Sequence, residues 1–127
     1  MIMKTEKTYS WVLRILNPST GEVEYRTRMC LTTTEIKQDA EILISDNRDL
    51  CVCIFKIHKK SSNAKSKRKY SWIFRYYDVL NGRICYRLHR SLTVDDVYFL
   101  ASEFRQANIN YRLGIFKLRF YKRNVSE

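Results

Sequence analysis

The fold is decided by two related stretches, YSWVLRILNPSTGEVEYR at residues 9–26 and YSWIFRYYDVLNGRICYR at residues 70–87. A shift of 61 positions aligns them without a gap. The same shift carries residues 31–32 onto 92–93 and residues 54–56 onto 115–117, and each of these pairs is identical. Chance does not keep one register over half a chain. The sequence therefore predicts an internal tandem duplication, with copies at residues 9–60 and 70–121.

Each copy is predicted to begin with a β-hairpin and to end with a third strand. In residues 9–16 the side chains alternate with the period of a strand, and residues 17–21 break the pattern as a turn. The return strand covers residues 22–30. In the second copy the hairpin strands cover residues 70–77 and 83–90, with a turn signal at residues 80–82. The third strands, at residues 50–57 and 111–120, are rich in β-branched and aromatic residues.

A helix is predicted between the second and third strands of each copy. Thr32 precedes Glu35 by three residues, and Thr93 precedes Asp96 by the same spacing, which is the pattern of a capping box. Apolar residues then recur at helical spacing, so each helix has one apolar stripe to lay on a sheet. The stripes contain Ile36, Ala40, Leu43 and Ile44 in the first copy, and Val97, Leu100, Ala101 and Phe104 in the second. Asn47 and Asn108 are expected to end the helices.

These elements predict an α+β fold built from a duplicated ββαβ unit. The first strand of each unit can lie between the other two, with the helix on one face of an antiparallel or mixed sheet. The expected organisation is a first repeat at residues 1–60, a basic linker at 61–69 and a second repeat at 70–127. The repeats are expected to pack about a pseudo-twofold axis as one compact domain.

The charge balance indicates a polyanionic partner. The chain has 24 Lys and Arg against 13 Asp and Glu, a formal net charge of +11. Such an excess increases self-repulsion, and attraction to phosphate is its usual reason. No apolar run approaches the roughly 20 residues that a membrane helix needs, so no spanning segment is expected.

The four cysteines are expected to be buried free thiols in a reduced, cytoplasmic protein. No apolar leader precedes them. Cys51 and Cys53 are two residues apart and should share one face of a strand, which is not the C-x2-C spacing of a zinc site. No metal and no cofactor are therefore expected.

The candidate site is the sheet face of each unit that the helix leaves open. Side chains at alternate positions of a strand point to the same face, and the positions that carry apolar residues are expected to point toward the helices. They are Trp11, Leu13, Val23 and Tyr25 in the first copy, and Trp72, Phe74, Ile84 and Tyr86 in the second. The opposite parity is expected to present the guanidinium groups of Arg14, Arg26, Arg28, Arg75, Arg83 and Arg87 for bidentate contact with phosphate. Tyr76 or Tyr77 is a candidate for stacking on an unpaired base. The alternative interpretation is a solvated face whose arginine stems pack for stability.

The linker is the most basic stretch of the chain and is expected to be a mobile loop that contacts phosphates. Its candidate contacts are Lys65, Lys67, Arg68 and Lys69. The alternative is a connection that only keeps the protein in solution.

The residues favour a binding protein over an enzyme. His58 and His89 stand alone, and the three glycines form no phosphate-binding loop. We expect a non-enzymatic nucleic-acid-binding protein that prefers RNA or single strands to duplex DNA, because no basic recognition helix is evident. The alternative is a small inhibitor of the kind that phages and mobile elements encode, which binds a host or defence protein that handles nucleic acid. The sequence leaves the oligomeric state open.

Overall fold

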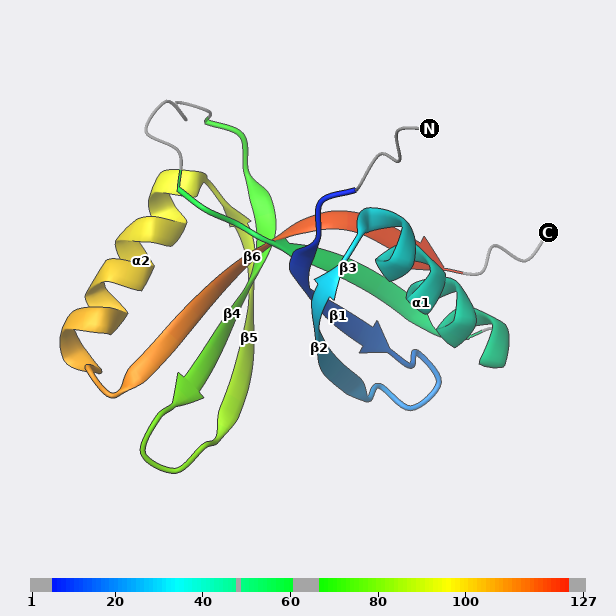
Figure 1. Cartoon of the computed structure of the whole chain (residues 1–127), viewed down its shortest axis with the longest axis horizontal. Coiled ribbons are helices and arrows are strands. Elements are labelled where there is room, and N and C mark those ends of the chain that lie inside the picture. The colour runs from blue at the N-terminus through cyan, green and yellow to red at the C-terminus, as the bar shows by residue number, and fades with distance from the viewer. Residues whose placement is uncertain (1–5, 48, 61–66, 124–127) are drawn as a thin grey trace, which may run out of the picture. The chain divides into compact units, whose positions relative to one another are not determined.

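The computed structural model describes residues 6–47, 49–60 and 67–123 (Figure 1). The fold is α+β, with a six-stranded antiparallel sheet and two helices. Along the sheet the strand order is β2-β1-β3-β6-β4-β5. The elements, in chain order, are β1 (Tyr9–Leu16), β2 (Val23–Leu31), α1 (Thr33–Asp46), β3 (Cys51–Ile57), β4 (Tyr70–Asp78), β5 (Ile84–Leu92), α2 (Val94–Ala107) and β6 (Tyr111–Arg123).

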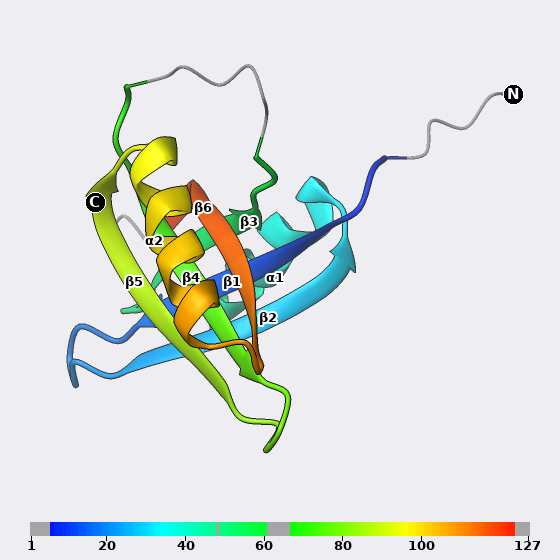
Figure 2. The ribbon, with the colours of Figure 1, turned by 90° about the vertical axis from the view of Figure 1, so that its left-hand side faces the viewer.

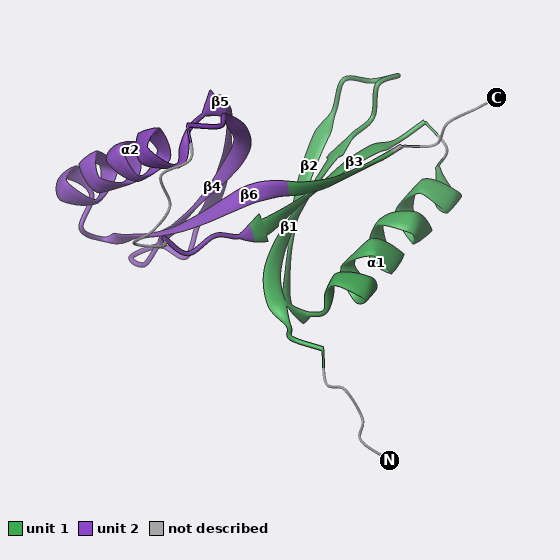
Figure 3. Cartoon of the chain, turned by 90° about the horizontal axis from the view of Figure 1, so that it is seen from above, with its two compact units in different colours: residues 1–56, 119–127 green, residues 57–118 purple. Residues whose placement is uncertain are grey.

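The chain divides into two compact units (Figure 3). Unit 1 comprises residues 1–56 and 119–127, and unit 2 comprises residues 57–118. The strand β6 therefore contributes residues 111–118 to unit 2 and its remaining residues to unit 1. The repeat boundaries expected at residues 60 and 70 stay a prediction.

Each unit has a central strand, as the sequence predicted. In unit 1, β1 pairs antiparallel with β2 on one side and with β3 on the other. In unit 2, β4 pairs in the same way with β5 and β6. The strand bounds differ from the predicted ones by no more than three residues.

Both predicted capping boxes are present. The Thr32 hydroxyl accepts a hydrogen bond from the backbone N–H of Glu35 at 3.2 Å, and the Glu35 carboxylate accepts one from Thr32 at 2.9 Å. Thr93 and Asp96 exchange the same two bonds, each at 3.1 Å. These bonds satisfy N–H groups that the first turn of a helix leaves without partners. Asn47 and Asn108 are the C-caps, so the predicted helix ends are confirmed.

A β-bulge interrupts the outer strand of each hairpin. Tyr9 pairs with Leu31 and Trp11 pairs with Arg28, so β2 has one residue more than β1 over this interval. The extra residue is accommodated with Cys30 at φ 60°. In β5 the equivalent irregularity places Ser91 at φ 59°. A bulge reverses the side-chain alternation of its strand from one end to the other.

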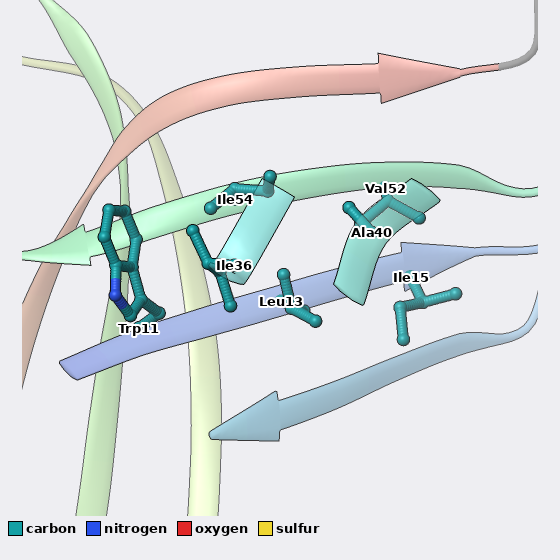
Figure 4. Close-up of a cluster of buried hydrophobic side chains, with 7 residues drawn as sticks. All are labelled: Trp11, Leu13, Ile15, Ile36, Ala40, Val52 and Ile54. Carbon is teal, nitrogen blue, oxygen red and sulfur yellow. The ribbon is translucent and has the colours of Figure 1, made fainter. Parts of the chain in front are cut away.

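The core of unit 1 lies between its sheet and α1 (Figure 4). Trp11 is buried there, and its indole N–H donates to the carbonyl of Leu31 at 2.9 Å. Trp72 is buried in the core of unit 2 and donates to Leu92 at 3.0 Å. The predicted core positions of the two tryptophans are therefore confirmed. The cluster in unit 1 consists of Trp11, Leu13, Ile15, Ile36, Ala40, Val52 and Ile54.

The side of each sheet opposite its helix is not uniformly open, which corrects the expectation of one covered and one exposed face. Val12 pairs with Phe55 on that side of unit 1, and both side chains are buried. Ile73 pairs with Phe116 in unit 2, and both are buried as well. The run of apolar residues at the start of β1 and of β4 is the sequence pattern of a strand that is covered on both faces.

Candidate nucleic-acid interface

The predicted arginines do not share one face of the sheet, which is the main correction to the sequence-based site. Residues paired across antiparallel strands lie on the same side, and Leu13 pairs with Arg26 while Arg14 pairs with Tyr25. Arg26 and Arg28 therefore lie on the helix side of unit 1, whereas Arg14 lies on the opposite side. Arg28 confirms this placement, because its Nε is 3.5 Å from the Asp39 carboxylate on α1.

Unit 2 repeats the same division. Phe74 pairs with Arg87, and Arg75 pairs with Tyr86, so Arg75 and Arg87 lie on opposite sides. The assignments of Val23, Tyr25, Ile84 and Tyr86 to the helix side were wrong for the same reason. The bulges explain the error. Leu31 and Leu92, which follow the bulges, face the helices, but the extra residue in each strand shifts the alternation of the residues before it, so that even-numbered residues of β2 and odd-numbered residues of β5 face the helices there.

The remaining predicted residues are in different settings. Arg14 Nε donates to the Tyr25 hydroxyl at 3.4 Å, and Arg26 forms an ion pair with Glu24. Arg83 is exposed in the β4–β5 turn. The Tyr76 ring packs between Phe74 and Phe104 on the helix side, with centroid distances of 6.2 Å and 4.6 Å. Burial raises the pKa of Tyr76, against a smaller lowering by Arg87. Tyr77 lies on the opposite side and pairs with Ile84.

Three of the predicted linker cations are exposed just before β4. Lys67, Arg68 and Lys69 are exposed, and Lys69 helps to lower the pKa of Asp96 in the first turn of α2. The larger causes of that lowering are the two hydrogen bonds with Thr93. Lys69 is therefore close to the N-terminal end of α2. Lys65 lies outside the described residues.

The positive charge belongs almost entirely to unit 2. Its sequence has 13 Lys and Arg against 4 Asp and Glu, a formal net charge of +9. Unit 1 has 11 against 9, a formal net charge of +2. A polyanion is therefore attracted mainly to unit 2.

The structure brings cations and aromatic rings together at the N-terminal end of α2. We call His58, Lys60, Tyr70, Tyr98 and Lys117 the basic–aromatic cluster. Lys117 Nζ is 3.7 Å from the centroid of the Tyr70 ring, and Lys60 Nζ is 5.4 Å from that of Tyr98. Both distances are within the range of a cation–π interaction. Each ammonium group thus lies near an aromatic ring, and no carboxylate of the described residues forms an ion pair with it.

His58 ties the cluster to the core of unit 2. Its Nδ1 lies 2.9 Å from the Tyr98 hydroxyl, which donates to the His58 carbonyl at 3.3 Å. The imidazole meets the Trp72 ring edge-on, with centroids 5.1 Å apart. Burial lowers the pKa of His58, and the nearby Lys117 lowers it further. These effects favour the neutral imidazole, and the Tyr98 hydroxyl is fixed by two partners.

Unit 1 has a smaller counterpart of this cluster. Lys56 Nζ lies 3.7 Å from the Tyr9 ring centroid, and Lys37 Nζ lies 4.2 Å from that of Phe120. The candidate site residues predicted from the sequence did not include Lys117 or any of these aromatic partners. The signal was present, because the shift of 61 positions matches Lys56 with Lys117 and Tyr9 with Tyr70.

The thiols differ from the expectation of uniform burial. All four cysteines are free of disulfide bonds, but Cys30 and Cys85 are exposed, and Cys51 and Cys53 are half-buried. The exposed pair belongs to the outer strands, β2 and β5. Within the described residues, no group of three or more His, Cys, Asp or Glu is arranged to hold a metal ion. None of the described helices has the length and apolar character needed to cross a membrane.

Comparisons with protein-family models, with curated proteins and with solved structures found no match.

Proposed function

We propose that this chain is a non-enzymatic, cytoplasmic nucleic-acid-binding protein that prefers RNA or single strands to duplex DNA. The observation that carries the proposal is the basic–aromatic cluster in a unit with a formal net charge of +9. Lysines near aromatic rings are typical of surfaces that follow a sugar–phosphate backbone beside unstacked bases.

The cluster suits this role because its cations are positioned before the ligand arrives. Lys117 is held at the Tyr70 ring, and Lys60 lies near Tyr98, whose hydroxyl His58 fixes. A phosphate that contacts either ammonium group releases condensed counterions, and neither group is in an ion pair with another described residue. The exposed residues Lys67, Arg68 and Lys69 add positive charge just before β4, and Lys69 lies close to the start of α2.

The proposal includes the tandem duplication of a ββαβ unit. The shift of 61 positions relates the hairpin registers, the two capping boxes and the two bulges with positive φ. It also relates the two indole hydrogen bonds to main-chain carbonyls. These agreements support one unit copied once, with nucleic-acid binding concentrated in the second copy.

The test is the affinity for labelled single-stranded RNA, hairpin RNA and duplex DNA, measured by fluorescence anisotropy at two salt concentrations. The variant Lys60→Gln/Lys117→Gln removes two ammonium groups of the cluster and should weaken RNA binding by about 1 to 3 kcal/mol in total. The matched control is Lys56→Gln, which removes the cation at the Tyr9 ring in unit 1 and should leave affinity nearly unchanged.

Two results would contradict the proposal. One is that the parent protein binds none of the three probes below roughly 10⁻⁴ M, the weak end of ordinary non-specific binding. The other is that Lys56→Gln weakens binding as much as the double variant. The first result would favour the alternative function, a small inhibitor that blocks a nucleic-acid-handling host or defence protein.

A further inference from the structure

The C-terminal end of α2 adjoins an exposed apolar surface. Val79 and Leu80 lie in the β4–β5 turn, and Ile109 lies in the α2–β6 turn. Their side chains are exposed to 48%, 77% and 86%. The backbone N–H of Val79 donates to the Asn110 carbonyl at 3.0 Å, so the two turns are in contact. We call Val79, Leu80 and Ile109 the apolar tip. The two turns that contain them, β4–β5 and α2–β6, lie at the lower ends of β4 and β6 in Figure 2.

The apolar character continues onto the adjoining strand ends. Ile84 begins β5 and Tyr111 begins β6, and both are exposed large side chains. Tyr111 is anchored by its ring contact with Phe104 of α2, at a centroid distance of 5.6 Å. Such a group of exposed apolar residues is larger than the single exposed side chains that are normal on a protein surface.

The fold of the hairpin does not require these apolar residues, and unit 1 provides the comparison. The shift of 61 positions matches Val79, Leu80 and Ile109 with Pro18, Ser19 and Arg48. The β1–β2 turn nevertheless closes in the same way, since Gly21 and Gly82 have φ of 76° and 73°. Each glycine donates its N–H to a carbonyl four residues earlier, at 2.7 Å and 2.8 Å. The apolar tip is therefore a feature of the second copy that turn formation does not explain.

Charges at the border of the tip indicate what covers it. Arg83 and Arg112 are exposed and adjoin Ile84 and Tyr111 in the sequence. The Asp78 carboxylate accepts from the backbone N–H of Leu80 at 3.0 Å, so it is engaged within the turn. Two like-charged tips repel each other, which disfavours a second copy of this chain as the occupant. Carboxylates complement the two guanidinium groups.

We propose that the apolar tip is a docking site for a partner protein, through a segment that combines apolar side chains with Asp or Glu. The site is separate from the basic–aromatic cluster, because the two lie toward opposite ends of α2, a helix that is about 20 Å long at 1.5 Å per residue. This inference does not rest on the proposed nucleic-acid binding. Together the two sites let one unit contact a nucleic acid and a protein.

The test uses the full chain and a displayed library of random linear peptides. Selected peptides are expected to be enriched in large apolar residues together with Asp or Glu. Leu80→Ser/Ile109→Ser should weaken the best of them by at least about tenfold, because central apolar anchors carry most of the affinity. Arg83→Glu, which introduces the residue type that unit 1 has at the matched position Glu22, should weaken it by about threefold and reduce its salt dependence.

Control variants separate docking from other effects. Phe99→Gln removes an exposed apolar side chain elsewhere on α2 and should leave peptide affinity unchanged. Lys60→Gln/Lys117→Gln should also leave it unchanged, whatever its effect on RNA. Three outcomes overturn the proposal: selected peptides without carboxylates, full affinity of the Leu80→Ser/Ile109→Ser variant, or displacement of the peptide by single-stranded RNA. The last would make the tip part of a nucleic-acid surface.

Discussion

His58 should contribute to the pH dependence of the free energy of unfolding. Burial, and then Lys117, hold its pKa in the folded protein below 6.5. The unfolded chain therefore binds a proton at a higher pH than the folded protein does, and stability is lost as pH falls from 7 through 6.5 and below. We expect His58→Gln to reduce this loss, as measured by urea unfolding between pH 7.5 and about pH 5.

His89 should contribute to the same pH dependence of stability. Its pKa is also lowered, first by burial and then by Arg87. Its Nε2 is buried without a hydrogen-bond partner among the described residues. His89→Gln should therefore reduce the loss as well, and the double variant should have the flattest profile. An unchanged profile for His58→Gln would show that the folded protein accepts the proton as readily as the unfolded chain.

The four thiols should react at different rates, because they differ in exposure to solvent. Cys30 and Cys85 are exposed, whereas Cys51 and Cys53 are half-buried on strand β3. Treatment of the native protein with a maleimide should add two groups quickly and the other two slowly, and denaturation should make all four react at once. Mass spectrometry of the intact protein measures the count, and peptide mapping assigns the fast pair. Fast labelling of Cys51 or Cys53 would contradict the structure.

Each helix depends on one threonine at its start. Thr93→Ala removes a hydroxyl that accepts from the Asp96 N–H, and the loss should reduce the free energy of unfolding by about 1 kcal/mol. The same change should raise the pKa of Asp96 part of the way, because it removes the side-chain hydrogen bond of Thr93 and leaves the backbone hydrogen bond, the largest cause of the lowering, in place. Urea unfolding and a carboxyl titration by NMR measure the two effects.

Thr32→Ala is the matched variant in α1, where the capping box has the same two bonds. It should destabilise the protein by a similar amount without affecting Asp96. A stability unchanged in both variants would mean that water replaces the caps at no cost.

The sequence predicted the helices and strands better than it predicted the side of the sheet on which each side chain lies. The capping boxes, the central strands and the buried tryptophans follow from local patterns that the sequence repeats. The sides on which the arginines lie were not predicted correctly, because the bulges at Cys30 and Ser91 reverse the side-chain alternation along the outer strands β2 and β5. Val12 and Phe55 are buried on the side that was expected to be open, although the apolar run in β1 is the pattern of a strand that is covered on both faces. The basic–aromatic cluster depends on contacts between residues distant in sequence, such as His58 with Tyr98.

At the scale of the whole molecule, the unequal charge of the two units should determine the salt dependence of binding. Replacing Lys67, Arg68 and Lys69 by Gln should reduce the slope of log affinity against log salt for single-stranded RNA by up to about 2, since each phosphate contact contributes about 0.7. Replacing three unit-1 cations, Lys7, Arg28 and Lys37, is the control and should change the slope much less. Equal changes would indicate that the ligand does not distinguish the units.

The last strand has a consequence for how the protein is made. Phe120 packs against the core of unit 1, and Lys122 pairs with Glu41 of α1 at 3.2 Å, although 62 residues of unit 2 separate these positions from the rest of unit 1. A ribosome that has released residues 1–56 has therefore not yet supplied all of unit 1. Unit 2, which is continuous in sequence, can close first. The earlier part of the chain then lacks the contacts of Phe120 and Lys122, and the apolar surface that Phe120 covers is vulnerable to aggregation until residue 122 emerges.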